Sequence, residues 1–184
     1  MKKTAICALI LSLALLLCAC GEEESSRFEE FRRGLGSAAE LSFTARLRAE
    51  YENKTESFVL ELEKNADTCT VAVVEPEIIK GIKAHMAEDG DRLEYDGIIL
   101  DVGKLTENGL TPMSALPMLV NSLPDAFLVS AFSEGDMLCA VLQPDEELII
   151  KLWLDAASLT PLSAEMNVGG VSVIFADIEN WRIS

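Results

Sequence analysis

The residues of this 184-residue chain that could do chemistry are its five cysteines and its single histidine. A cysteine can be acylated, can bind a metal or can pair with a second cysteine, and a histidine can act as a general base. Cys18 and Cys20 stand two residues apart, where an uncharged apolar stretch gives way to the acidic stretch GEEESS. Their position at this boundary predicts a modified residue at the start of the mature protein.

The segment before this boundary has the layout of a secretory signal peptide. Met1-Lys2-Lys3 is a short basic head, and Thr4 to Leu17 is apolar and rich in Leu, Ala and Ile. The apolar stretch from Thr4 to Cys20 is shorter than the ~20 apolar residues that a membrane-spanning helix usually needs. We therefore expect residues 1–19 to be a signal peptide, and an uncleaved membrane span is the alternative.

The residues Leu17-Cys18-Ala19-Cys20-Gly21 resemble the bacterial lipobox, in which a cysteine is diacylated and becomes the first mature residue. The pattern requires Leu three residues before that cysteine and a small residue immediately before it. Cys20 has Leu17 and Ala19 at these places, whereas Cys18 has the bulky Leu17 directly before it. Cys18 is itself a departure, in a place that more often holds Ala, Ser, Thr or Val. The resemblance implies that Cys20 carries a diacylglyceryl anchor in the membrane, on the extracytoplasmic face of a bacterial cell membrane.

Removal of residues 1–19 leaves 165 residues, enough for one domain with a hydrophobic core. The mature chain has 13 basic residues against 31 acidic ones, a net charge of −18. This acidity argues against binding of nucleic acid or of anionic lipid headgroups, because both need positive charge. We expect residues 20–26 to form a solvated, lipidated tether and residues 27–184 to form the folded domain.

Lipidation of Cys20 leaves two cysteines, Cys69 and Cys139, in the mature chain. An even number of cysteines outside the cytoplasm permits a disulfide between them. Each lies in an apolar stretch that is typical of a strand, so two buried free thiols are the alternative.

Two segments have the spacing of helices. Residues 26–35 predict a helix with Ser26 as its N-cap and an apolar face at positions 28, 31 and 35. Residues 111–123 predict an apolar helix in the middle of the chain. Thr111 before Pro112 suits an N-cap followed by the first helical residue. The alternative is a cap at Ser114, which would place the awkward Pro117 in the first turn.

The rest of the chain is dominated by strands. Apolar and polar residues alternate from Leu41 to Tyr51 and again near Leu162 to Val168. Turn signals such as Asp96-Gly97 separate further strand-like segments, and the connections are too short for parallel crossovers. We expect an α+β protein: about ten antiparallel strands in a curved sheet, an incomplete β-barrel with helices on its concave face.

This order of elements resembles the LolA/LolB-like lipoprotein superfamily. Residues 73–82, VVEPEIIKGI, look like the third strand of that family running into a proline turn, and residues 151–166 look like its late hairpin. The resemblance covers residues 27–184 and is nearest to the GerS-type germination lipoproteins of spore-forming bacteria. It implies a half-barrel that curls around helices and whose concave face can hold acyl chains.

The resemblance implies a non-catalytic envelope protein that binds or supports a partner protein, in cell-wall or spore germination processes. The alternative is binding of a lipid or other hydrophobic ligand in the concave face of the half-barrel. The side chains that would line such a pocket, or plug it, are those of Phe43, Leu47, Phe58, Leu60, Leu116, Leu119 and Val120. A roomy enclosed cavity would favour the ligand, and a filled core with an exposed apolar patch would favour the partner.

The sequence contains few residues suited to catalysis. His85 alternates with apolar neighbours on an expected strand, which favours a residue of the wet face over a general base. The sequence has no nucleophile elbow, HExxH or phosphate-binding glycine loop, and its acidic residues lack the spacing of metal ligands. We therefore expect no enzymatic activity, no metal and no cofactor.

The predicted anchor can be tested by substitution at the two neighbouring cysteines. Cys20→Ala removes the thiol that the lipid would modify, so we expect it to abolish incorporation of a fatty-acid probe during metabolic labelling. Cys18→Ala is the matched control and should leave labelling intact. Label retained in the Cys20→Ala protein would contradict the anchor.

Overall fold

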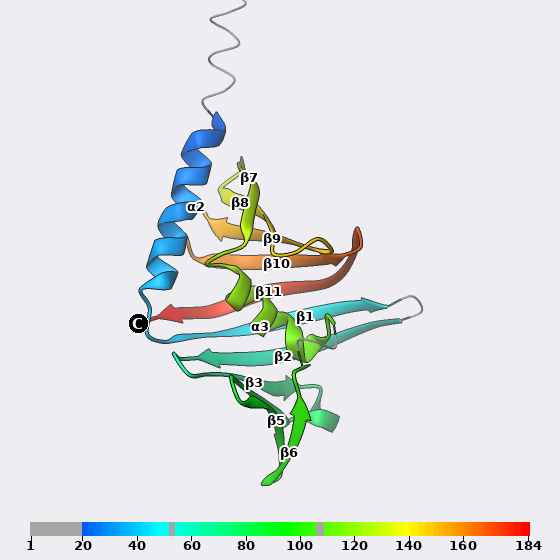
Figure 1. Ribbon diagram of the computed structural model, residues 1–184. Coiled ribbons are helices and arrows are strands. Elements are labelled where there is room, and N and C mark those ends of the chain that lie inside the picture. The colour runs from blue at the N-terminus through cyan, green and yellow to red at the C-terminus, as the bar shows by residue number, and fades with distance from the viewer. Residues whose placement is uncertain (1–19, 52–53, 106–108) are drawn as a thin grey trace, which may run out of the picture.

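The computed structural model describes residues 20–51, 54–105 and 109–184 (Figure 1). The helices are α2 (Cys20–Gly36), the short 3-10 helix η1 (Glu77–Ile79) and α3 (Pro112–Ser122). The strands are β1 (Leu41–Tyr51), β2 (Lys54–Lys64), β3 (Thr68–Glu75), β4 (Lys83–Ala87), β5 (Gly90–Tyr95), β6 (Ile98–Gly103), β7 (Phe127–Glu134), β8 (Met137–Gln143), β9 (Leu148–Asp155), β10 (Pro161–Val168) and β11 (Val171–Ile183). The predicted signal peptide, residues 1–19, lies outside the described residues.

All eleven strands belong to one antiparallel sheet, which is curved and open. Their order is β6-β5-β4-β3-β2-β1-β11-β10-β9-β8-β7, so the first strand of the chain pairs with the last in the middle of the sheet. This pairing runs from Leu41 opposite Ile183 to Ala49 opposite Ile174. β6 and β7 form the two edges. The fold class predicted from the sequence is confirmed, with eleven strands in place of about ten.

The alternation in the sequence determines which face of each strand is buried. In β1, the odd-numbered residues from Leu41 to Ala49 are buried, and the residues between them are half-buried or exposed. β9 repeats the pattern, with Leu148, Ile150, Leu152 and Leu154 all buried. Because side chains of a strand point alternately to its two faces, the alternating buried residues of β1 and β9 line one face of the sheet, the concave one.

Helix α2 begins at Cys20, six residues before the predicted start. The prediction of Ser26 as the N-cap was wrong: its hydroxyl donates a hydrogen bond to the carbonyl of Glu22 at 2.8 Å, within the helix. The predicted tether, residues 20–26, therefore forms the first turns of this helix. Glu22 and Glu23 lie in its first turn, where the helix dipole favours acidic side chains.

The predicted apolar face of α2 is confirmed. Phe28 and Phe31 are buried in the core, and Leu35 packs against it. The helix lies against β7 and β8, and Glu24 accepts a hydrogen bond from the hydroxyl of Ser133 at 2.9 Å. This bond holds the first turns of α2 beside the end of β7.

Helix α3 begins with a reciprocal capping arrangement. The hydroxyl of Thr111 accepts from the backbone N–H of Ser114 at 3.2 Å, and the hydroxyl of Ser114 accepts from the N–H of Thr111 at 2.9 Å. Thr111 is thus the N-cap and Pro112 the first helical residue, and the alternative cap at Ser114 is wrong. Pro117 lies inside the helix, where it has no N–H to donate to the carbonyl of Met113.

Both α-helices contribute side chains to one continuous core with the concave face of the sheet. In Figure 1, α3 crosses in front of the central strands, and α2 runs along the ends of the strands towards β7 and β8. In the part of the chain that the structure describes, no helix combines the length and hydropathy needed to cross a membrane.

Leu119 tests whether α3 fills the concave face. Its side chain is 1% exposed, so Leu119→Ala leaves a cavity in a packed core, and we expect it to cost ~2–5 kcal/mol of the free energy of unfolding. Leu162→Ala is the matched control, since Leu162 is 39% exposed and its truncation should change stability by less than about 0.5 kcal/mol. Urea unfolding measures both. If both variants lost the same small amount of the free energy of unfolding, Leu119 would border an open pocket.

Candidate functional site

The seven residues predicted to line or plug the concave face come together in the structure. Phe43, Leu47, Leu60, Leu116, Leu119 and Val120 are each at most 3% exposed, and Phe58 is half-buried and packs against them. They form a solid plug, in which α3 lies against β2 and β3. Of the two arrangements distinguished from the sequence, the described residues form the filled core.

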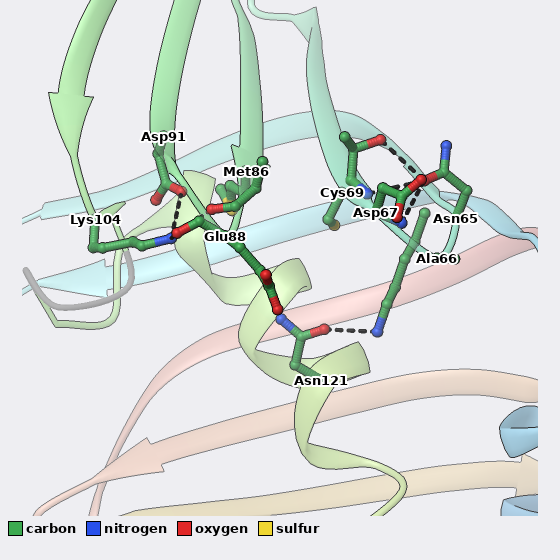
Figure 2. A pocket seen from close by; sticks show the side chains of 12 residues that line it. Asn65, Ala66, Asp67, Cys69, Met86, Glu88, Asp91, Lys104 and Asn121 are labelled. Carbon is green, nitrogen blue, oxygen red and sulfur yellow. Dashed lines mark hydrogen bonds and ion pairs between the residues drawn. The ribbon is translucent and has the colours of Figure 1, made fainter.

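Hollows do exist at the surface, but they are open to solvent rather than enclosed. One, of about 350 Å³, lies between the ends of β2–β5 and helix α3 (Figure 2). Asp91, only 3% exposed, accepts a hydrogen bond from the N–H of Leu105 at 2.6 Å, and the ammonium of Lys104 lies 3.8 Å from its other oxygen. Lys104 also donates to the carbonyls of Ala87 and Glu88. These contacts fasten the segment after β6 to β4 and β5, so their role is structural.

A second hollow, of about 400 Å³, lies on the convex face across β8–β11 and β1. Two aromatic rings line it, and a charged side chain contacts each of them. The guanidinium of Arg48 lies 4.1 Å from the centre of the Phe175 ring, and the indole N–H of Trp153 donates to Glu134 at 2.8 Å. These contacts satisfy the polar groups across the strands of a solvent-facing sheet surface.

Cys69 and Cys139 are both free and buried, so of the two alternatives left open by the sequence the structure has the free thiols and not the disulfide. Cys69 belongs to the core, whereas Cys139 lies between the core residues Leu138 and Ala140 and therefore points to the opposite face. Six strand-to-strand steps separate β3 from β8, about 29 Å along the sheet. A disulfide needs Cα atoms within about 7 Å. Burial raises the pKa of each thiol to about 11.

His85 lies on the convex face, as predicted, and is half-buried. Its Nε2 lies 2.9 Å from a carboxylate oxygen of Glu94, and its Nδ1 lies 3.1 Å from the hydroxyl of Thr70. These two partners were not identified from the sequence. The three residues come from neighbouring strands β3, β4 and β5, and none of them lines either of the two hollows above. Among the described residues, no group of acidic, histidine or cysteine side chains could hold a metal ion.

The edge strand β6 exposes three consecutive apolar side chains. Ile98, Ile99 and Leu100, which we name the apolar edge, are 64, 61 and 59% exposed. Leu100 lies opposite Leu93, which packs against the core, so Ile98 and Leu100 face the concave side and Ile99 the convex side. The sequence analysis did not identify this feature. Its signal is three consecutive apolar residues directly after the Asp96-Gly97 turn, which make both faces of one strand apolar.

The other edge of the sheet also exposes apolar residues, but two features protect it. β7 has a register shift between Leu128 and Ser130, and helix α2 packs against it. Bulges and covering elements are devices that prevent strands from pairing at an open edge. The pairing of β6 with β5 shifts register only between Asp91 and Arg92 of β5, at the end remote from the turn, and the apolar edge itself is regular. The apolar edge is therefore the best candidate for a functional site.

Maleimide labelling tests whether Cys69 and Cys139 are free and buried. Because both pKa values are raised to about 11 by burial, each thiol is protonated and unreactive at pH 7.5 in the native protein. We expect negligible maleimide labelling of native protein, and labelling of both Cys69 and Cys139 after denaturation without reductant, as measured by peptide mass spectrometry. Denatured protein that labels only after reduction would reveal a disulfide.

No family model matches the sequence, and no curated protein matches it. Solved structures are similar in fold. An uncharacterized conserved protein from Thermus thermophilus is 8% identical, with a TM-score of 0.51 over 87% of each chain. A LolA superfamily protein from Nitrosomonas europaea is 12% identical, with a TM-score of 0.48 over 87% of this chain and 93% of that one.

The structure of the CwlD amidase from Clostridioides difficile in complex with the GerS lipoprotein also contains a similar chain. It is 12% identical, with a TM-score of 0.46 over 86% of this chain and 94% of that one. The similar structures thus include a LolA superfamily protein and a chain of the complex between CwlD and the GerS lipoprotein. At these identities, the chain is similar to them in its fold, a curved open sheet with helices against it.

Proposed function

We propose that this chain is a lipid-anchored, extracytoplasmic protein of a bacterial envelope that binds a partner protein and has no catalytic role. The observation that carries the proposal is the contrast between a filled concave face and an exposed apolar edge. Three neighbouring side chains that are about three-fifths exposed cost free energy in water, and such patches commonly mark binding surfaces. A supporting role in cell-wall or germination processes is consistent with the family resemblance.

The filled core argues against a lipid carrier. An acyl chain needs an apolar cavity, and pockets that bind small molecules enclose most of the ligand surface. Here α3 occupies that position, with Leu116, Leu119 and Val120 each at most 1% exposed. A ligand in the concave face would first have to displace the helix.

The place of the anchor favours β6 over β7 as the binding edge. α2 begins at Cys20, and the bond between Glu24 and Ser133 keeps its first turns beside β7. β6 lies ten strand-to-strand steps away, about 48 Å along the curved sheet. Figure 1 shows it at the far end of the molecule from the start of α2. A lipid on Cys20 would therefore hold β7 near the membrane and leave β6 accessible to a partner.

Site-specific crosslinking tests this function. We replace Ile99 by the photoreactive p-benzoylphenylalanine in the cells that produce the protein and expect one discrete crosslinked adduct, because the exposed side chain would lie in the interface. The matched control places the same residue at Leu162, which is exposed on β10, away from both edges, and should give no such adduct.

Lipid binding is tested on the same protein. We expect the purified chain to show no saturable, one-to-one binding of a fluorescent fatty acid, because its concave face is filled. Stoichiometric fatty-acid binding together with the absence of an adduct from position 99 would overturn the proposal and favour a hydrophobic ligand.

A further inference from the structure

The backbone of β6 has hydrogen-bonding groups that an added strand could use. β5 and β6 are joined by a two-residue turn, Asp96 and Gly97, with φ values of 50° and 75°, and Tyr95 lies opposite Ile98. Positive φ at both central residues is typical of a type I′ hairpin, whose closing pair exchanges both backbone hydrogen bonds. Since bonded and non-bonded pairs alternate along the ladder, the N–H and C=O of Ile99 point away from β5.

The side chains beside this backbone are apolar on both faces of the strand. Ile98 and Leu100 extend the concave apolar surface beyond the core, and Tyr95, 52% exposed, lies next to Ile98 on β5. Ile99 is exposed on the convex face. The apolar edge contains no lysine, proline or bulge, which are common protections against strand pairing.

The charge around the apolar edge is negative. From Asp89 to Asp101 the chain has five acidic residues and a single basic one, Arg92. Arg92 already donates to Asp89 at 2.7 Å and to Asp101 at 3.2 Å. The nearest charged residues along the chain are Asp96, two residues before the apolar edge, and Asp101, directly after it. A second copy of the chain would bring the same acidic residues to this edge, and like charges on paired strands oppose pairing.

We propose, resting on the function above, that β6 accepts an extended segment of the partner protein as a twelfth strand. The segment carries about three consecutive aliphatic residues flanked by lysine or arginine. Its backbone pairs with the outward N–H and C=O groups of Ile99. Its apolar side chains cover Ile98, Ile99 and Leu100, and its basic residues lie near Asp96 and Asp101.

The probe is the fluorescein-labelled peptide Lys-Lys-Val-Ile-Val-Lys-Lys, titrated with the full chain in detergent and followed by fluorescence anisotropy. We expect saturable binding that weakens when NaCl is raised from about 50 to about 500 mM, because salt screens exposed charges. The control peptide Glu-Glu-Val-Ile-Val-Glu-Glu should bind at least about tenfold more weakly. Equal affinity for both peptides would overturn the charge complementarity.

Two changes isolate the backbone pairing. Ile99→Pro removes only an N–H that points away from β5, so the hairpin should persist, and we expect at least about tenfold weaker peptide binding. Ile99→Thr retains that N–H and the branched side chain, so its affinity for the peptide should fall much less. In an extended peptide, successive N–H groups point to opposite edges of the strand. N-methylation of the two central amides therefore removes one donor from each edge of the peptide, and the methylated peptide should bind the unmodified protein at least about tenfold more weakly than the parent peptide. Unchanged affinity of the methylated peptide would overturn strand addition even if Ile99→Pro fails to fold.

The failure of this inference can be distinguished from failure of the proposed function. If position 99 crosslinks a partner in cells but neither peptide binds, partner binding stands and strand addition is wrong. A dimer in analytical ultracentrifugation that dissociates on Ile99→Pro substitution would identify a second copy as the occupant and overturn the basic partner. Loss of both the crosslink and the peptide binding would contradict the two proposals together.

Discussion

Covering the apolar face of an open sheet is the constraint on which the rest of this structure depends. A closed barrel buries its inner face by curling upon itself, but eleven strands that stop short of closure leave that face to be covered by something else. Here the cover is helix α3, held at its start by the reciprocal bonds between Thr111 and Ser114, together with the aromatic face of α2. The same covering removes the space that a lipid would need.

Openness has a second consequence, because a sheet that does not close has two edges. The edges of this sheet differ in ways that follow from the course of the chain. β7 directly follows α3 in the chain and lies under α2, which both covers it and brings it close to Cys20. β6 is the last strand before the chain leaves the sheet for α3, and in the described residues no element packs along its outer side. The exposed apolar residues and the acidic surroundings of β6 therefore lie where a partner can reach them.

Much of the fold could be predicted because its signals are local. The period-two alternation of β1, the turn residues and the Thr111-Pro112 start of α3 each depend on a few neighbouring residues, and each was confirmed. The start of α2 was misplaced, since Ser26 has the chemistry of a cap but the acidic residues before it also suit the first turn of a helix. The seven residues expected at the concave face lie in or against one core, and the choice between a plug and an open pocket depended on three-dimensional packing.

The sequence by itself determined the acidic charge and the strand-rich half-barrel, and it predicted a lipobox cysteine and the candidate residues of the concave face. Only the tertiary structure decided that Cys69 and Cys139 lie on opposite faces six strands apart, and that His85 lies between Glu94 and Thr70. It also decided that Ile98–Leu100 form an exposed edge. The physical reason is that alternation specifies the two faces of a strand, whereas the neighbours of that strand are set by the order of the whole sheet.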